Sequence, residues 1–308
     1  MKRYMQKLML ILLTSVVMTG FASLAEASVR IFACEPEWAA LATEIGGDDV
    51  SIYTATHALQ DPHHIQARPS LIARMRRANL VIATGAQLEI GWLPVLLRQS
   101  ANPAVQPGQA GNLAAADYVQ KLDVPTRIDR AQGDIHPGGN PHIQTDPHNI
   151  AIVAGVLLHR LQQIDSDHAD AYQKRYNDFM SRWKQAMQAW QQQAAPLRGM
   201  RMLVYHKGWA YMMRWLGLVE ADALEPVPGV PPTTSHLSSL LAKLKQQPAA
   251  MIIYAAYQDP RAAEWLARRA NIKAVKLPFT VGGTDAATDL FGLYDDTIHR
   301  LLMAKQGQ

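Results

Sequence analysis

The chain has 308 residues, of which 48% are hydrophobic and 18% are charged, and its formal net charge is +4. This composition is that of a globular protein, and so small a net charge gives no basis for nucleic-acid binding. The single cysteine, Cys34, excludes an intrachain disulfide, and we expect it to be a buried thiol in a strand.

Residues 1–27 have the pattern of a cleavable secretory signal. A basic head, MKR, precedes an apolar run at 8–25, and an A-x-A pattern ends at Ala27. The alternative is an uncleaved membrane anchor, for which the apolar run is short. Cleavage before Ser28 would remove three positive charges and one negative charge, leaving a net charge of +2 and enough chain for two modest domains or one large domain.

The first half of the mature chain alternates apolar strands with helices, which predicts a parallel sheet covered on both faces. The expected strands are 28–33, 50–55 and 80–85, and the expected helices are 35–47, 68–78 and 88–99. Residues 99–141 are rich in Gly, Pro and Asn and read as loops. A helix follows from 146 to 164, with Asp146 as its N-cap and Pro147 at its first position.

Residues 166–197 predict one long amphipathic helix. The segment has no glycine, and its only proline is Pro196 near the end. Aromatic residues and methionine recur at three- and four-residue spacing, which is the spacing of one helix face. Such a helix would join two lobes as a rigid backbone, the alternative being an ordinary surface helix of one domain.

After Gly199 the alternation of strands and helices begins again. The expected strands are 202–206, 219–225, 249–256 and 274–279, and the expected helices are 208–217, 234–247, 260–270 and 288–305. We therefore expect two similar α/β lobes, an N-terminal lobe at 28–165 and a C-terminal lobe at 198–308, connected by the helix at 166–197.

Three histidines fall at the ends of strands or in connecting loops. His63 follows the second strand, His142 precedes a helix, and His206 is the last residue of the strand MLVYH. Ligands of open parallel sheets bind beyond the carboxyl ends of the strands, so these imidazoles are expected to meet at one cleft. Three imidazoles with a carboxylate or a water molecule form a tetrahedral zinc site.

Other histidines are more simply explained as surface or hydrogen-bonded residues, and they are His57, His136, His159, His168, His236 and His299. His64 and His148 either support the ligands or are unrelated neighbours. Glu35 and Glu37 follow the first strand and either shape the site or cap the first helix, and capping is the favoured interpretation.

The sequence resembles the metal-binding solute-binding proteins of zinc and manganese ABC importers over nearly all of the mature chain. The resemblance rests on the stretches DPHHIQARPS, ANLVIATGAQLEIGWLP, NPHIQTDP, VYHKGWAYMMRWLGL and PGVPPTTSHLSSLLAKLK. It implies two lobes joined by one long helix, and metal ligands at His63, His142 and His206. A fourth ligand, often an acid, is expected before the last helix, with Asp285 as first choice and Asp289, more suited to a helix N-terminus, as second.

The resemblance implies zinc as the bound ion and manganese as the less favoured one, because manganese members have an acid where His206 stands. It further implies a monomer in the periplasm that captures the ion and passes it to an ABC importer permease in the inner membrane. Two other functions stay open: a zinc-dependent hydrolase with a carboxylate base, and a periplasmic zinc chaperone without a permease.

Overall fold

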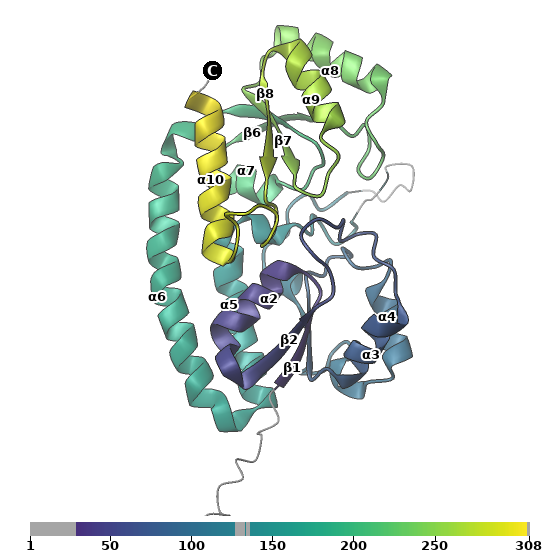
Figure 1. Cartoon of the computed structure of the whole chain (residues 1–308), viewed down its shortest axis with the longest axis vertical. Coiled ribbons are helices and arrows are strands. Elements are labelled where there is room, and N and C mark those ends of the chain that lie inside the picture. Colours follow the sequence, from purple (N-terminus) through teal and green to yellow (C-terminus); the bar gives the residue numbers. More distant parts are fainter. Residues whose placement is uncertain (1–28, 127–132, 134–135, 307–308) are drawn as a thin grey trace, which may run out of the picture.

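The computed structural model describes residues 29–126, 133 and 136–306, so the predicted signal at 1–27 lies outside the described residues. The chain forms two α/β lobes, one above the other (Figure 1). Each lobe contains a four-stranded parallel sheet, with strand orders β2-β1-β3-β4 and β6-β5-β7-β8. The strands are β1 Val29–Ala33, β2 Val50–Thr54, β3 Leu80–Ala83, β4 Asn112–Ala114, β5 Arg201–Val204, β6 Val219–Ala223, β7 Met251–Ala255 and β8 Lys273–Leu277.

Helices cover both faces of each sheet, which confirms the predicted fold class. In the N-terminal lobe, α2 packs on one face and α3 with α4 on the other, and both inner strands, β1 and β3, consist almost entirely of buried residues. The helices are α2 Pro36–Gly46, α3 Pro69–Arg77, α4 Leu93–Ser100, α5 Pro147–Ile164, α6 Ala169–Gln193, α7 Ala210–Leu216, α8 Thr234–Gln246, α9 Arg261–Ala270 and α10 Leu290–Gln306. No helix in the described part of the chain is both long and apolar enough to span a membrane.

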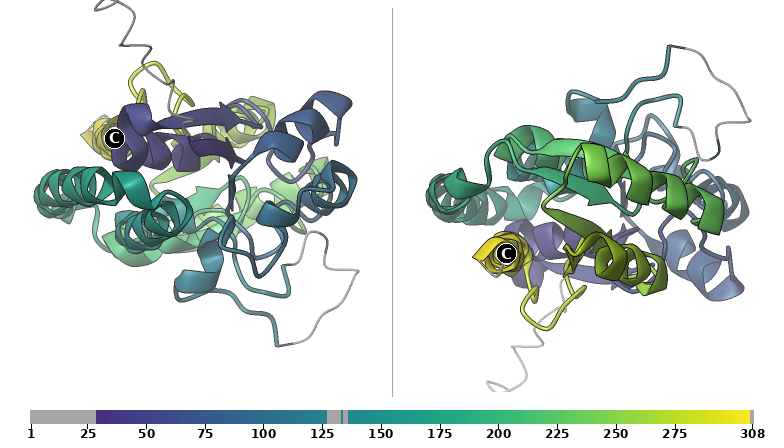
Figure 2. Two further views of the ribbon diagram at one scale, coloured as in Figure 1. Left: turned by 90° about the horizontal axis from the view of Figure 1, so that it is seen from below. Right: turned by 90° about the horizontal axis from the view of Figure 1, so that it is seen from above.

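Helix α6 is the long helix that the sequence predicted, and it runs along one side of both lobes beside α10 (Figures 1 and 2). Its 25 residues correspond to a length of about 37 Å. The α-helix is shorter than the expected 166–197, because its ends tighten into 3₁₀ turns at Ser166–His168 and Ala195–Leu197. The buried face carries Tyr172, Phe179, Trp183 and Trp190.

One continuous cluster of buried apolar side chains joins the lobes. It runs from Ile31 and Trp38 in the N-terminal lobe, through Trp183 of α6, to Tyr211 and Ile253 in the C-terminal lobe. A large hydrophobic contact between lobes restrains their relative motion. The site between the lobes is therefore held by a rigid frame.

Two local expectations need correction. His206 is not the last residue of a strand, because β5 ends at Val204 and His206 lies in the turn that follows. The stretch TSHLSS predicts an N-cap near Thr234 or Ser235 for α8, but the cap is Thr233, whose hydroxyl accepts from the His236 backbone N–H at 3.3 Å. Asp146 caps α5 as predicted, accepting from the His148 backbone N–H at 2.9 Å.

Candidate metal centre

His63, His142 and His206 converge between the lobes. One ring nitrogen from each lies within 4.8 Å of the others, and all three side chains are buried. Their ring centroids are 5.3, 5.4 and 5.6 Å apart. Nitrogens held at about 2.0–2.1 Å from a tetrahedral ion would place the ring centroids roughly 5 Å apart, so the rings already have the spacing of a metal site.

Each of these histidines comes from a different connection, as the strand-end argument predicted. His63 lies in the loop between β2 and α3, His142 just before α5, and His206 between β5 and α7. The His63 loop is fixed by Trp92, whose indole N–H donates to the carbonyl of Pro62 at 2.9 Å. Two of these imidazoles thus come from the N-terminal lobe and one from the C-terminal lobe, and an ion bound by all three would bridge the lobes.

Carboxylates orient two of the rings. Asp61 Oδ1 lies 2.7 Å from Nδ1 of His63, and Glu225 Oε2 lies 2.7 Å from Nδ1 of His206. A carboxylate on Nδ1 places the ring proton there and leaves Nε2 as a free electron pair for a metal. Nε2 of His63 is buried and has no hydrogen-bond partner among the residues described here.

His142 is held through its backbone rather than its ring. Asn140 Oδ1 accepts from the His142 backbone N–H at 3.0 Å, while the Asn140 amide donates to the carbonyl of Lys207 at 2.9 Å. Tyr211 donates from its hydroxyl to the Asn140 carbonyl at 2.7 Å. These bonds tie the His142 loop to the C-terminal lobe, so the position of one ligand depends on both lobes.

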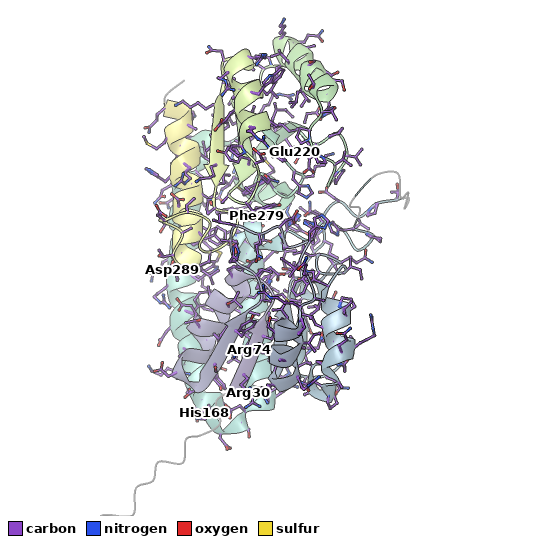
Figure 3. The ribbon with its side chains drawn as sticks, turned by 45° about the vertical axis from the view of Figure 1, so that its right-hand side comes forward. Arg30, Arg74, His168, Glu220, Phe279 and Asp289 are labelled. Carbon is purple, nitrogen blue, oxygen red and sulfur yellow. The ribbon has the colours of Figure 1, made fainter. Side chains whose placement is uncertain are left out.

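Phe279 closes the site on the side of the C-terminal lobe, at the junction between the lobes (Figure 3). Its ring centroid is 5.3 Å from that of His142, 4.9 Å from Trp209 and 5.7 Å from Tyr257. Phe279 has a φ of +67°, an unfavourable backbone conformation for a bulky residue. This strained backbone conformation places the ring of Phe279 against the imidazole of His142.

On another side the histidines face an open cavity of about 540 Å³. Its lining includes His136, His142, His206, Lys207 and Glu220. A polar cavity that reaches buried imidazoles provides a path for a hydrated cation. Figure 3 places Glu220 in the C-terminal lobe above Phe279.

Burial keeps the imidazoles of His142 and His136 neutral. Desolvation, reinforced by His63, His206 and His136, holds the pKa of His142 well below its ordinary value. Desolvation, with smaller effects of His63 and His206, lowers the pKa of His136 to about 4. Neutral imidazoles are the form that binds a metal ion, so these two groups need not lose a proton to do so at neutral pH.

The acidic candidates from the sequence lie elsewhere. Asp285 is exposed and does not belong to the group of ligand atoms formed by the three histidines among the described residues. Asp289 is also exposed, and its Oδ1 accepts from the Gly292 backbone N–H at 2.7 Å at the start of α10, as expected for a helix N-terminus. His148 is 58% exposed and bonded to Asp146, outside the group.

The favoured capping role of Glu35 and Glu37 is wrong for Glu35. Glu35 occupies the N-cap position of α2, but its side chain makes no capping hydrogen bond and is buried beside Thr84 and Glu89. Glu37 instead accepts a hydrogen bond from Thr280 of the C-terminal lobe. Glu35 therefore packs behind the histidines rather than capping the helix, whereas Glu37 lies in the first turn of α2.

Several residues of the site were not predicted from sequence, among them Glu225 and His136. Glu225 follows β6, and the same strand-end argument that selected the histidines applies to it. His136 lies in a Gly- and Pro-rich stretch without periodicity, where only its closeness to the GNPH stretch gave a signal.

Comparison with known proteins decides the family. A family model described as ZnuA, zinc-uptake complex component A, periplasmic, matches residues 31–304. The chain belongs to this family. It is thus a metal-binding solute-binding protein of the ABC importers for zinc and manganese, which confirms the resemblance found from the sequence.

Relatives of this ZnuA-family chain include two manganese proteins and a ZnuA. The manganese ABC transporter substrate-binding lipoprotein PsaA of Streptococcus pneumoniae is 24% identical over 244 residues, which cover 77% of this chain and 74% of PsaA. The crystal structure of a ZnuA has a TM-score of 0.73 at 22% identity and covers 89% of this chain and 99% of that one. FpvC of Pseudomonas aeruginosa, in complex with Mn²⁺, has a TM-score of 0.75 at 18% identity and covers 91% and 99%. At these identities the structural likeness establishes the two-lobed fold.

Proposed function

We propose that this protein captures Zn²⁺ between its lobes in the periplasm and delivers it to the permease of an ABC importer in the inner membrane. His63, His142 and His206 would be the metal ligands. The observation that carries the proposal is the convergence of three buried imidazoles with ligand atoms within 4.8 Å of one another. Three protein ligands leave one tetrahedral position, for which the resemblance predicts Asp285.

The donor set favours zinc over manganese. Mn²⁺ is a hard ion that prefers carboxylate oxygen, whereas imidazole nitrogen suits Zn²⁺. The carboxylates of Asp61 and Glu225 are engaged on the Nδ1 atoms of His63 and His206, so they support ligands rather than serve as ligands. Cu²⁺, Ni²⁺ and Co²⁺ are expected to bind in vitro as well.

The frame around the site implies capture with small movements. The continuous apolar cluster and helix α6 resist wide opening of the lobes, so entry and release would depend on small tilts and on the loops that carry the ligands. The domain boundaries at 28–165, 166–197 and 198–308, cleavage of residues 1–27 and a monomeric state are part of the same proposal.

Metal titration tests the proposal directly. A competition titration of Zn²⁺ against a chromogenic chelator at pH 7.5 should give one ion per chain. Replacing His63, His142 and His206 together by alanine should abolish that binding, while His159→Ala, an exposed histidine on α5, should leave it unchanged. A metal-bound crystal structure with anomalous data at the zinc edge would identify the ion and its ligands.

Two results would point to the other functions. Hydrolysis of ester or peptide substrates by the zinc-loaded protein, lost in the triple variant, would favour a hydrolase over capture. Transfer of zinc to an apo-enzyme, without any zinc-uptake defect in cells that lack this protein, would favour a chaperone. If the triple variant still takes up one zinc ion per chain, the proposed site is wrong.

A further inference from the structure

A fourth imidazole, that of His136, stands beside the three histidines. Its ring centroid is 5.3 Å from that of His63, with the two planes inclined by 30°, and 6.4 Å from that of His142. Its Nε2 is buried and accepts or donates no hydrogen bond within the described part of the chain. A buried polar nitrogen without a partner is costly unless a ligand satisfies it.

Two glycines near His136, Gly133 and Gly139, pack closely on other parts of the chain. A Cβ atom at Gly133 would lie 2.1 Å from the carbonyl oxygen of Pro228, and one at Gly139 would lie 2.8 Å from that of Leu122. Both glycines have positive φ values, of +77° and +97°, so a side chain is excluded on conformation as well as on space. The Gly139 backbone N–H also donates to the His136 carbonyl at 2.9 Å, closing a turn that presents the imidazole to the site.

His136 also stands on the route to the site. His136, His142 and His206 all line the cavity of about 540 Å³, so an ion that enters through it passes the His136 ring. The His136 nitrogens are not part of the group within 4.8 Å that the other three form. To bind the same ion as the other three imidazoles, the His136 side chain has to rotate away from its stack on His63.

We propose that His136 is the fourth metal ligand, so that the captured cation is held by four imidazoles. This inference rests on the proposed function and specifies the ligand class of that site. A shell of four neutral nitrogens with no carboxylate favours Zn²⁺, Cu²⁺ or Co²⁺ and disfavours Mn²⁺ more strongly than three imidazoles and an acid. His136 would therefore set the metal specificity, in the position for which the resemblance predicts Asp285.

X-ray absorption at the zinc edge of the wild-type protein tests this without any variant. Scattering from the outer ring atoms counts imidazoles, and we expect four nitrogen ligands, all imidazole. Three imidazoles with one oxygen would overturn the inference. Replacement of Zn²⁺ by Co²⁺ gives a second measure, because its visible ligand-field spectrum changes when a nitrogen ligand is replaced by oxygen.

Variants test whether His136 or Asp285 is the fourth ligand. His136→Ala should weaken zinc binding by about 10- to 100-fold or more and shift the Co²⁺ spectrum, and added imidazole should restore the wild-type spectrum. Asp285→Asn and His159→Ala should do neither. Circular dichroism and thermal unfolding of the metal-free variants establish that each is folded.

The outcomes distinguish this inference from the proposed function. If His142→Ala abolishes zinc binding while His136→Ala leaves the affinity and the Co²⁺ spectrum unchanged, the capture site stands and His136 is not a ligand. If Asp285→Asn produces the loss expected of His136→Ala, the acid is the fourth ligand. If His142→Ala leaves zinc binding intact, the proposed function fails, and this inference fails with it.

Discussion

Glu225 is hydrogen-bonded to the imidazole of His206, with its Oε2 2.7 Å from Nδ1 of the ring. The same oxygen accepts from the Gly229 backbone N–H at 2.9 Å, so the carboxylate is itself fixed in place. Both side chains are largely buried, at 12% and 9% exposure. Glu225 thus fixes the ring orientation of the single proposed ligand that the C-terminal lobe contributes.

Glu225→Gln should lower zinc affinity by about 10- to 100-fold, because an amide weakens the hydrogen bond that orients His206 and reduces the basicity of its Nε2. Chelator competition at pH 7.5 measures the change. Asp259→Asn, which alters an exposed ion pair with Arg261, is the matched control and should leave the affinity unchanged. An unchanged affinity in Glu225→Gln would mean that His206 is not a ligand or needs no orientation.

Zinc affinity should fall as the pH falls, because protons compete with the metal for imidazole nitrogen. Burial holds the pKa of His142 well below its ordinary value, so His142 stays neutral through the range in which an exposed histidine takes up a proton. At most two of the three proposed ligands then compete with protons near pH 5.5. Isothermal titration between pH 7.5 and 5.5 measures the zinc association constant, whose base-10 logarithm should change by no more than about two for each pH unit. A change of three per pH unit would contradict this.

The pH also affects the metal-free protein. A histidine with a lowered pKa in the folded state takes up its proton more readily when unfolded, so the free energy of unfolding falls as pH drops below about 6.5. The metal-free His142→Ala variant lacks this loss but keeps the buried carboxyl groups, so its melting temperature should rise relative to that of the wild type between pH 7 and pH 5. An unchanged difference between the two proteins over this range would contradict the burial of a neutral His142.

Much of the fold could be predicted because its signals are local. Runs such as LVIA in β3 contain only apolar residues, which is typical of a strand covered on both faces, and the absence of glycine from 166 to 197 predicted α6. The gathering of His63, His142 and His206 followed from a rule of topology, that parallel strands end at one edge. These predictions depended on chain order and periodicity, and both can be read from the sequence.

The rest depended on contacts between distant residues. His136 occupies an aperiodic loop, and its ring lies 5.3 Å from that of His63, 73 residues away in the sequence. Glu35 has the sequence position of a helix cap, yet its carboxyl group turns toward Glu89, 54 residues away. No local pattern records either contact, because both arise only when the loops of the folded lobes meet.

Trp183 connects the two lobes through α6. Its indole N–H donates to the carbonyl of Pro147 at 2.9 Å, and its ring lies 5.0 Å from Phe291 and 5.5 Å from Tyr294, both on α10. Trp183→Ala should lower the free energy of unfolding by about 3–5 kcal/mol, because it removes a fully buried aromatic ring. Urea denaturation measures this, and Gln188→Ala, at an exposed position of the same helix, should change it by less than about 0.5 kcal/mol.

Glu35, Glu37 and Glu89 are buried carboxyl groups behind the metal centre. Their raised pKa values make the folded protein more stable as the pH falls, which is opposite to the effect of His142. Burial raises the pKa of Glu89 to about 7, and the hydrogen bonds that Glu89 accepts from the backbone N–H groups of Thr84, at 2.7 Å, and Gly85, at 3.1 Å, limit that rise. Glu35 Oε2 accepts a hydrogen bond from the Thr84 hydroxyl at 3.2 Å, and the Glu35 carboxyl group accepts no hydrogen bond from a backbone N–H among the residues that the structure describes. Burial, with the charges of Glu89 and Glu37, raises the pKa of Glu35 well above its ordinary value. When Glu35 and Glu89 hold one proton between them, that proton therefore resides on Glu35.

Glu35→Gln should therefore stabilise the protein at pH 8. Below about pH 4.5 both the folded and the unfolded states hold the Glu35 proton, but at higher pH only the folded state retains it, and the free energy of unfolding falls. A glutamine amide can donate to Glu89 in place of that proton without titrating. We expect a gain of about 1–3 kcal/mol at pH 8 that largely disappears at pH 4.5, measured by urea denaturation. Glu264→Gln, on the exposed face of α9, should show no such pH-dependent gain, and a loss of stability in Glu35→Gln at pH 8 would mean that Glu35 is ionised in the folded protein.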